Sequence, residues 1–574
     1  MFPKDFISWD DCEDDEDDFV AFRDHRQGVQ EVISACYVAL GDRVFNFLSS
    51  KLDSFGDNSS RWEILEAILL MCSTIIPHLK SKDLRLTHES NLFLKRLFSI
   101  YLYTTRVSSP ILAETACRCL QASTFLITSQ KPHLTEFQEY FWPALHLCLN
   151  AMAIPLSCTT AVKAMHQLTV HGSKILLRDG NSTLNMIHAS TALLASLPPE
   201  AALMTVESTT RISVQMSPED AKVALWATLN PLLNALSSEL QTLTPSPQLV
   251  ARLLDYCAQM IRFCDTVSSD VLQPLLTAVW PLVKLAETNA TTKLNEEVIE
   301  CIFKFYRCSL NSALSLVISE VDTIGQSITN VIGNGFMGQR HALNCASTLL
   351  EVLKGNSSDE ALHFLIRFIE VITQLFLRHL QGGSYDADAL ESYFSFVYSA
   401  QLHSAHALSA SPVALDTIPR LCITCLQVCK ERVVLRNVLQ VLQAAVAPPY
   451  AGAQVFHAPI YDATIRHANR IIEVLIQCLA GEVTSANRQN VIDTIVLLLS
   501  SSTDPVFVSS SINWVGSAIE SLSIPQLNSE TQSFVVQAIF RLIRSNPRLL
   551  KALLQDFSKV CCSELQPDCL LAYE

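Results

Sequence analysis

Apolar residues recur at helical spacing along nearly the whole chain. They fall on one stripe of a helix in the segment that begins at Trp62, at Trp62, Leu65, Ile68, Leu69, Cys72, Ile75, Ile76 and Leu79. The same spacing returns at Val434, Val438, Val441, Leu442 and Ala445. Such spacing is typical of α-helices with one buried face. No long stretch alternates with period two, so we expect an all-α fold without a sheet.

Capping residues mark many of the expected helix starts. A polar side chain precedes a proline at Ser109-Pro110, Ser217-Pro218, Ser246-Pro247 and Asp504-Pro505. Proline at the first helical position needs no donor there, and the preceding side chain accepts from a free N–H group. Ser60 with Glu63 and Ser357 with Glu360 have the spacing of capping boxes. The helices between these signals should run about 12–22 residues.

Pairs of helices recur at a period of about 40–47 residues, the period of HEAT and armadillo arrays. The expected helix starts near Pro247, Leu294, Gln339, Asp386 and Glu431 show it best. We therefore predict an α-solenoid of HEAT-like helix-pair repeats, about twelve pairs curved into a superhelical arch. Residues 1–18 should form an acidic loop, and residues 19–574 one continuous solenoid.

Two segments look like copies of one another. "YFWPALHLCLN" from Tyr140 and "AVWPLVKLAET" from Ala278 share a Trp-Pro pair ahead of an apolar helical face. A proline inside a helix bends it, and a repeated bend would help to set the curvature of an array. A chance likeness between two amphipathic helices is the alternative.

Composition narrows the class of partner. Only 17% of the 574 residues are charged, which suits helices that bury two sides against neighbours, and the net charge is −15. That charge disfavours direct nucleic-acid binding and permits basic protein partners. The 19 cysteines lie singly in apolar patterns, and the acidic N-terminal residues do not resemble a secretory signal, so we expect reduced thiols in the cytoplasm or nucleus. We expect no membrane insertion, since Glu63 and Glu66 interrupt the most apolar run.

Three motifs suggest chemistry but lack its context. "GNGFMG" (Gly333–Gly338) has glycine spacing of a dinucleotide site, yet a helix precedes it where a strand is required, so an inter-helix loop is favoured. Cys422, Cys425 and Cys429 could face one metal, but no fourth ligand is adjacent and a buried helical stripe is favoured. His341, His403 and His406 have no acid or nucleophile at a suggestive spacing. We expect no enzyme, cofactor or metal.

The densest charge in the chain is "DDCEDDEDDF" (Asp10–Phe19), in which eight of ten residues are acidic. Like charges oppose helix formation within such a run, so we expect a solvated loop that enters a helix near Asp18. The acids then have two possible roles: favouring the helix N-terminus, or contacting a basic protein. For the second role the candidate residues are Asp14, Asp15, Glu16, Asp17 and Asp18.

An ordered series of segments resembles one family. "DEDDFVAFRDHRQGVQEVISACYVALGDRVFNFLSSKL", "RWEILEAILLMCSTIIPHL", "ILAETACRCLQASTFLITSQKPHLTEFQEYFWPALHLCLN", "PLSCTTAVKAMHQLTVHGSKILLRDG", "LLASLPPEAALMTVESTTRISVQ" and "LQPLLTAVWPLVKLAETNATTKLNEEVIECIFKFYRCSL" follow in this order. They are similar to the middle of the importin-13 and transportin-SR family, nuclear transport receptors of the importin-β type. The resemblance covers most of the chain and weakens beyond about Pro412. It rests on the order of the series, because no single motif is diagnostic.

The resemblance implies HEAT repeats, binding of the GTPase Ran in its GTP form, carriage of protein cargo, contact with Phe-Gly nucleoporins, and shuttling between cytoplasm and nucleus. In family members the acidic segment lies well inside the chain, so we expect this chain to lack the N-terminal repeats that supply the principal Ran surface. Transportin-SR has an arginine-rich helix for phosphorylated serine/arginine cargo. Here Glu297 and Glu300 stand in its place beside Lys304 and Arg307, which favours an importin-13-like receptor and disfavours phosphorylated serine/arginine cargo. The net charge and the resemblance together point to basic protein cargo.

Two other classes of function remain open on sequence. A HEAT-repeat scaffold outside transport, such as a phosphatase or assembly platform, would share the composition and the period. An enzyme that uses the cysteine triplet to hold a metal would share them too.

Overall fold

In the computed structural model every regular element in the described part of the chain is a helix. The described residues are 17–56, 62–80, 86–102, 109–335, 337–354, 358–381, 386–448, 455–482, 485–502, 504–522, 524 and 527–573. They contain helices α1 to α27 together with short 3₁₀ and π segments, and no strand. This confirms the predicted all-α fold. The chain divides into two compact units, residues 1–293 and residues 294–574.

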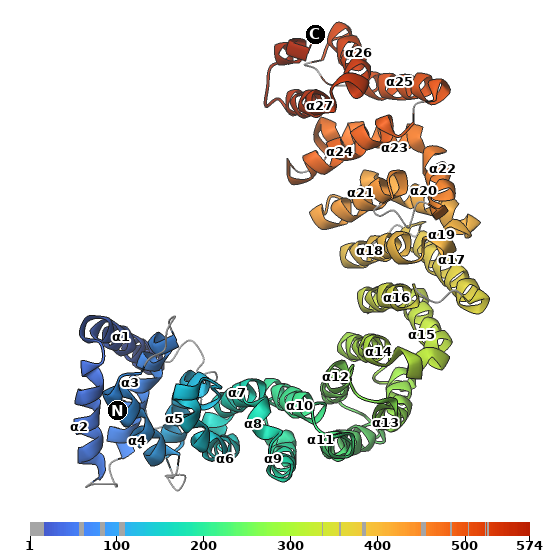
Figure 1. Cartoon of the computed structure of the whole chain (residues 1–574). Coiled ribbons are helices and arrows are strands. Elements are labelled where there is room, and N and C mark those ends of the chain that lie inside the picture. The colour runs from blue at the N-terminus through green and yellow to red at the C-terminus, as the bar shows by residue number, and fades with distance from the viewer. Residues whose placement is uncertain are drawn as a thin grey trace. The chain divides into compact units, whose positions relative to one another are not determined.

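Unit 1 consists of two rows of helices in which successive helices of a row pack together, except that the 3₁₀ segment Pro132–Tyr140 lies between α4 and α6 (Figure 1). The first row is α1 (Asp17–Leu40), α3 (Trp62–Ile75), α5 (Pro110–Ile127), α7 (Pro155–His171), α10 (Pro199–Ser213) and α12 (Pro247–Arg262). The second row is α2 (Arg43–Gly56), α4 (His88–Tyr101), α6 (Phe141–Met152), α9 (Gly180–Ala192), α11 (Pro218–Leu240) and α13 (Ser269–Thr288). The short α8 (Ser173–Leu176) follows α7.

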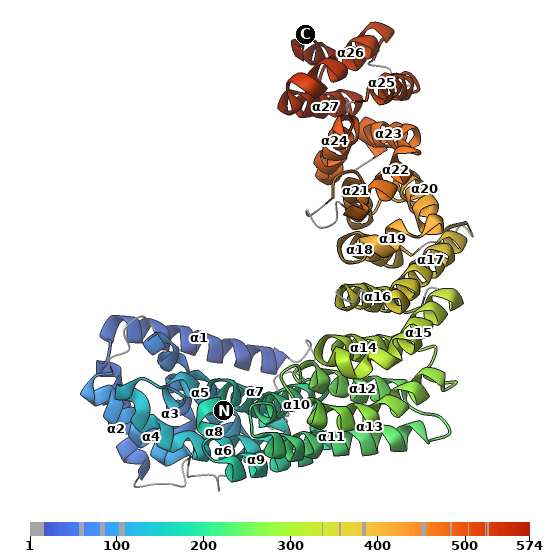
Figure 2. The same ribbon diagram turned by 45° about the vertical axis from the view of Figure 1, so that its right-hand side comes forward.

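Unit 2 has the same construction, with successive helices of each row packed together (Figure 2). Its first row is α14 (Glu296–Val317), α16 (Gln339–Leu353), α18 (Ala387–His403), α21 (Arg432–Val446), α24 (Ser485–Ser500) and α27 (Pro547–Cys561). Its second row is α15 (Val321–Asn334), α17 (Asp359–Gln381), α20 (Pro412–Val428), α23 (Ala468–Gln477), α25 (Pro505–Glu520) and α26 (Ser529–Ser545). The short α19 (Ala405–Ser409) and α22 (His457–Ile465) lie between rows.

Two packed rows of helices at this period confirm the predicted solenoid of helix-pair repeats. The starts expected near Pro247, Leu294, Gln339, Asp386 and Glu431 are found at Pro247, Glu296, Gln339, Ala387 and Arg432. Their successive separations are 49, 43, 48 and 45 residues. Each unit is a run of such repeats. One continuous array from residue 19 to 574 stays a prediction.

The predicted helix starts show why the elements begin where they do. Ser109, Ser217 and Ser246 each accept a hydrogen bond from the backbone N–H three residues later, and proline follows each of them. Asp504 does the same from Val506 N–H at the start of α25. These four predictions are confirmed.

The two capping boxes have a different outcome. Ser60 and Ser357 lie outside the described residues. Ser358 is the residue that caps α17, because its hydroxyl accepts from the Ala361 N–H group at 3.2 Å.

The two Trp-Pro segments lie on the second-row helices α6 and α13. The prediction that both prolines bend their helices is wrong for α6. Pro143 is the third residue of α6, where an N–H group has no intrahelical partner anyway, so it bends nothing. Pro281 does lie inside α13, two turns after Pro274, and both are exposed. There the carbonyl groups that each proline leaves unpaired can be hydrated.

One apolar stretch, Trp62–Leu79, is long and apolar enough by composition to span a bilayer. In this structure it comprises α3 and the 3₁₀ turn after it, and α3 is packed between α1 and α5 of the first row. Its Glu66 is buried and accepts from Arg26 Nη2 of α1 at 2.8 Å and from Thr115 Oγ1 of α5 at 2.7 Å. A buried, fully paired carboxylate of this kind belongs to a core helix.

We expect Glu66→Ala to destabilise the packing of α1, α3 and α5, because it removes the buried carboxylate that pairs with Arg26 and accepts from Thr115. The expected loss is about 3–5 kcal/mol in the free energy of local opening. Hydrogen exchange of the α1 and α3 amides measures it.

The matched control is Glu63→Ala, which removes an exposed carboxylate from the first turn of the same helix. Equal exchange in the two variants would show that the Arg26–Glu66 pair does not hold the row together.

Candidate partner-binding surface

The acidic residues singled out in the sequence lie at the edge of the described chain. Asp14, Asp15 and Glu16 fall outside the described residues, and Asp17 and Asp18 are the first two residues of α1. The helix start expected near Asp18 is therefore confirmed. A carboxylate in the first turn is favoured by the positive end of the helix dipole. The role of these residues in binding a partner stays a prediction.

On two helices of the first row of unit 1, α5 and α10, a carboxylate lies inward and the arginine paired with it lies outward. On α5, Glu114 pairs with Arg118 one turn later, and the side chain of Glu114 is 2% exposed against 43% for Arg118. Thr160 of α7 also approaches Glu114 Oε1, at 3.5 Å. The negative charge of this pair is thus buried between two helices, whereas the positive charge reaches solvent.

The same arrangement recurs on α10. Arg211 Nε lies 2.8 Å from Glu207 Oε1, with side-chain exposures of 42% and 22%. The other carboxylate oxygen of Glu207 accepts from Gln259 Nε2 of α12 at 3.3 Å. The guanidinium carbon of Arg211 lies 4.1 Å from the centre of the Phe263 ring, a cation–π contact that keeps it against α12.

Other cations extend this surface along the row. Lys163 on α7 and Arg252 and Arg262 on α12 are exposed. Helix α7 carries no carboxylate at all. Arg262 lies 5.5 Å from the Phe263 ring, on which Arg211 also stacks. Of the carboxylates on α5, α7, α10 and α12, Glu200 at the start of α10 is exposed and Asp255 on α12 is half-buried. Exposed cations outnumber exposed acids on these helices, so this face is locally basic although the chain is acidic.

The dipoles of three row helices favour cations at their ends. His171, Arg211 and Arg262 lie in the last turns of α7, α10 and α12. Each is placed near the free carbonyl groups of its own helix C-terminus.

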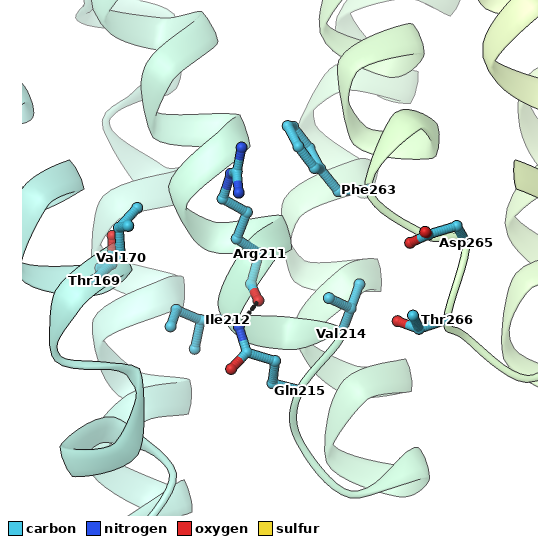
Figure 3. A pocket seen from close by; sticks show the side chains of 9 residues that line it. All are labelled: Thr169, Val170, Arg211, Ile212, Val214, Gln215, Phe263, Asp265 and Thr266. Carbon is cyan, nitrogen blue, oxygen red and sulfur yellow. Dashed lines mark hydrogen bonds between the residues drawn. The ribbon is translucent and has the colours of Figure 1, made fainter.

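A pocket of about 290 Å³ opens where α7, α10 and α12 end (Figure 3). Its lining is Thr169, Val170, Arg211, Ile212, Val214, Gln215, Phe263, Asp265 and Thr266. Figure 3 shows the Arg211 side chain beside the Phe263 ring, Thr169 and Val170 across from them, and Asp265 and Thr266 on the segment that follows α12. A dashed line marks the bond from Gln215 Nε2 to the Arg211 carbonyl, 2.8 Å long. The size of the pocket suits one side chain of a peptide better than a cofactor.

A half-buried histidine joins α7 to α10 within this row. His166 Nδ1 lies 2.8 Å from Ser208 Oγ. Burial lowers the pKa of His166 from its ordinary value. The imidazole is therefore favoured in its neutral form and acts here as a structural hydrogen-bond partner.

The motifs weighed for chemistry lie in ordinary helical packing. Gly335 and Gly338 have φ angles of 136° and 75° in the connection between α15 and α16, so "GNGFMG" joins two helices as expected. A Cβ at Gly338 would lie 2.5 Å from Ile299 Cγ2 of α14, which explains why glycine stands there.

The cysteine triplet is buried in α20 and at its C-terminal cap. Burial raises the pKa of Cys422, Cys425 (to about 12) and Cys429, so these thiols stay protonated at neutral pH. Within the described residues, no three His, Cys, Asp or Glu side chains are grouped so that they could hold a metal ion.

The residues in the place of the arginine-rich helix lie on α14. Glu297 and Glu300 are exposed, and Glu300 Oε2 lies 3.8 Å from His341 Nε2 of α16. Both carboxylates are thus available on the surface of unit 2, as expected for a helix unsuited to phosphate.

Sequence reasoning missed the basic face of the first row of unit 1. Arg118 and Arg211 each stand four residues after a glutamate, a spacing that signals a helical ion pair. That spacing does not show which member of the pair is buried, because burial depends on the helix one repeat away.

Comparison with known proteins supports the fold. No protein-family model and no curated protein sequence matches the chain. A solved structure of importin 13 in its cytosolic state is similar, with a TM-score of 0.70 and 15% sequence identity. The match covers 96% of this chain and 61% of that one, so the chain spans less than two thirds of its neighbour's length. The fold is that of an importin-β-like HEAT solenoid.

Unit 2 contains four partly buried histidines that make it sensitive to acid. Burial lowers the pKa of each of them, His403, His406, His457 and His467. An unfolded histidine binds its proton near pH 6.5, so acid favours the unfolded state. We expect full stability at pH 7 and above and a progressive loss as the pH falls below about 6.5. Urea unfolding at several pH values, followed by circular dichroism, measures it.

The control replaces the four histidines by glutamine, which cannot take up a proton. We expect this variant to lose less stability than the parent chain between pH 7 and pH 5.5. A pH dependence unchanged by the substitutions would contradict the prediction.

Proposed function

We propose that this protein is a nuclear transport receptor of the importin-β type, close to importin 13 in its mode of action. It binds protein cargo and the GTPase Ran, contacts Phe-Gly nucleoporins and shuttles between cytoplasm and nucleus. The single observation that carries the proposal is the likeness to importin 13, which extends over 96% of the chain. The ordered sequence resemblance points the same way.

The second row of unit 1 supports contact with apolar Phe-Gly segments. On α9, α11 and α13 the exposed charged residues are Glu219, Lys222 and Asp270, all within the first five residues of a helix. Beyond these turns the fully exposed side chains are uncharged, and Val223 and Leu285 are 51% and 41% exposed. The half-buried Lys284 and Glu287 beside Leu285 pair with each other at 2.9 Å. A surface this poor in charge can be covered by apolar peptide without stripping water from ions.

We expect the chain to bind a Phe-Gly repeat peptide, and Val223→Glu with Leu285→Glu to weaken that binding about fivefold or more. Charged side chains on this face would have to be desolvated by the peptide. Fluorescence anisotropy with a labelled Phe-Gly peptide measures the change. The control is Val506→Glu, at a 72% exposed valine on α25 of unit 2.

Ran supplies the second arm of the same test. A transport receptor should capture Ran loaded with GTP in preference to Ran loaded with GDP. Failure of both Ran-GTP and the Phe-Gly peptide to bind would favour a HEAT scaffold outside transport.

The acidic residues Asp14 to Asp18 are proposed to contact a basic cargo. We expect replacement of Asp14, Asp15, Glu16, Asp17 and Asp18 by their amides to weaken binding of a basic protein such as a histone about tenfold at low salt. Helical content by circular dichroism should not change. A loss of helical signal instead would assign these acids to capping α1.

A further inference from the structure

We propose that the exposed face of α5, α7, α10 and α12 binds an acidic segment of a partner protein. One apolar side chain of that segment enters the pocket at the ends of α7, α10 and α12 and anchors it. This inference rests on the proposed protein-binding function and names the chemistry of one partner. It differs from the expectation of basic cargo, which came from the net charge and the family resemblance.

The charges on this face favour an acidic partner. Arg118, Lys163, Arg211 and Arg262 come from four successive row helices and are exposed or half-exposed. The carboxylates beside them, Glu114 and Glu207, are mostly buried and already accept hydrogen bonds from the neighbouring helix. An incoming carboxylate therefore meets cations at the surface, whereas an incoming lysine would meet few accessible acids.

Contacts between the helices place these cations on one continuous face. The Glu114–Arg118 pair lies beside Thr160 of α7, and Lys163 follows Thr160 by one turn. His166 then contacts Ser208 of α10, and Arg211 contacts Phe263 of α12. A polypeptide laid obliquely across the row, from the middle of α5 and α7 to the last turns of α10 and α12, would pass these groups in sequence.

The pocket supplies the apolar part of the recognition. Val170, Val214 and the Phe263 ring form its walls, and Arg211 stands at its rim. Val170 is 41% exposed. An aliphatic or aromatic side chain entering here would bury apolar surface while its neighbours in the peptide stay within reach of Arg211 and Arg262. Asp265, at the opposite rim, would repel a carboxylate of the peptide that entered the pocket. The pocket therefore favours the apolar residue of the peptide over its acidic residues.

The test uses the full chain and a labelled synthetic peptide of glutamates with one leucine and one phenylalanine. Fluorescence anisotropy should show binding that weakens as NaCl rises from about 50 mM to about 300 mM. An unlabelled peptide with lysine in place of glutamate should not displace the labelled acidic peptide from this face. The peptide with glycine in place of leucine and phenylalanine should bind about fivefold more weakly, because the pocket stays empty.

Surface variants locate the site while keeping Arg118 and Arg211, the partners of Glu114 and Glu207. We expect Lys163→Gln, Arg252→Gln and Arg262→Gln together to lower affinity about tenfold or more, since each exposed ion pair contributes a factor of about two to five. The matched control is Lys131→Gln, Lys174→Gln and Lys222→Gln, which removes three exposed charges elsewhere in unit 1. It should change affinity less than about twofold. An equal loss in both triple variants would overturn the proposal in favour of general charge attraction.

Deletion of residues 1–16 tests whether this face is occupied by the chain's own acidic segment or by an external partner. A change of less than about threefold in peptide affinity supports an external partner. A larger gain would show that the chain's own segment competes for this face, and would overturn the proposal. If the full chain does not bind the acidic peptide but does bind Ran-GTP and the Phe-Gly peptide, this inference alone is overturned and the proposed transport function stands.

Discussion

The rest of the structure depends on one constraint: each interior helix of the first row is held between two others, so polar groups on both flanks must find partners one repeat away. Glu66 meets this constraint by accepting hydrogen bonds from both sides, from Arg26 and from Thr115. A buried carboxylate without such partners would cost several kcal/mol. The partners are 40 and 49 residues away, so the period of the repeat is also the period of the polar contacts.

The two units satisfy the constraint with different side chains. In unit 1 the bridging groups are mainly carboxylates and hydroxyls. In unit 2 side-chain amides are added to them: Asn437 donates to the Glu391 carbonyl at 3.1 Å, and Asn487 donates to the Arg432 carbonyl at 2.9 Å. Carboxylates bridge repeats there too, since Glu370 accepts from Ser411 Oγ at 2.9 Å. Amide bridges need no counter-charge. In unit 1, Glu114 and Glu207 are withdrawn from solvent while their partners Arg118 and Arg211 reach the outside, whereas Arg26, the partner of Glu66, is itself mostly buried.

The parts of the fold that depend on neighbouring residues in sequence could be predicted. Ser109, Ser217 and Ser246 cap helices because a hydroxyl before a proline suits a helix start in any surroundings. Pro143 shows the limit of such reasoning, because whether a proline starts a helix or bends one depends on where the previous turn ends. The basic surface could not be predicted from sequence. The spacing of Glu114 and Arg118 indicates an ion pair, but which of the two is buried depends on the neighbouring helix.

Net charge is for the same reason a weak guide to this protein's partners. Eight of its acids stand between Asp10 and Asp18, a span without a basic residue, so the other residues together carry −7. Among those, several carboxylates of the first row are withdrawn from solvent into pairs between helices. On α5, α7, α10 and α12 a partner meets the side chains that stay exposed, and most of the charged ones are basic. An array that hides one sign of charge in its repeat interfaces can therefore present the other sign to its partners, whatever the sum over the chain.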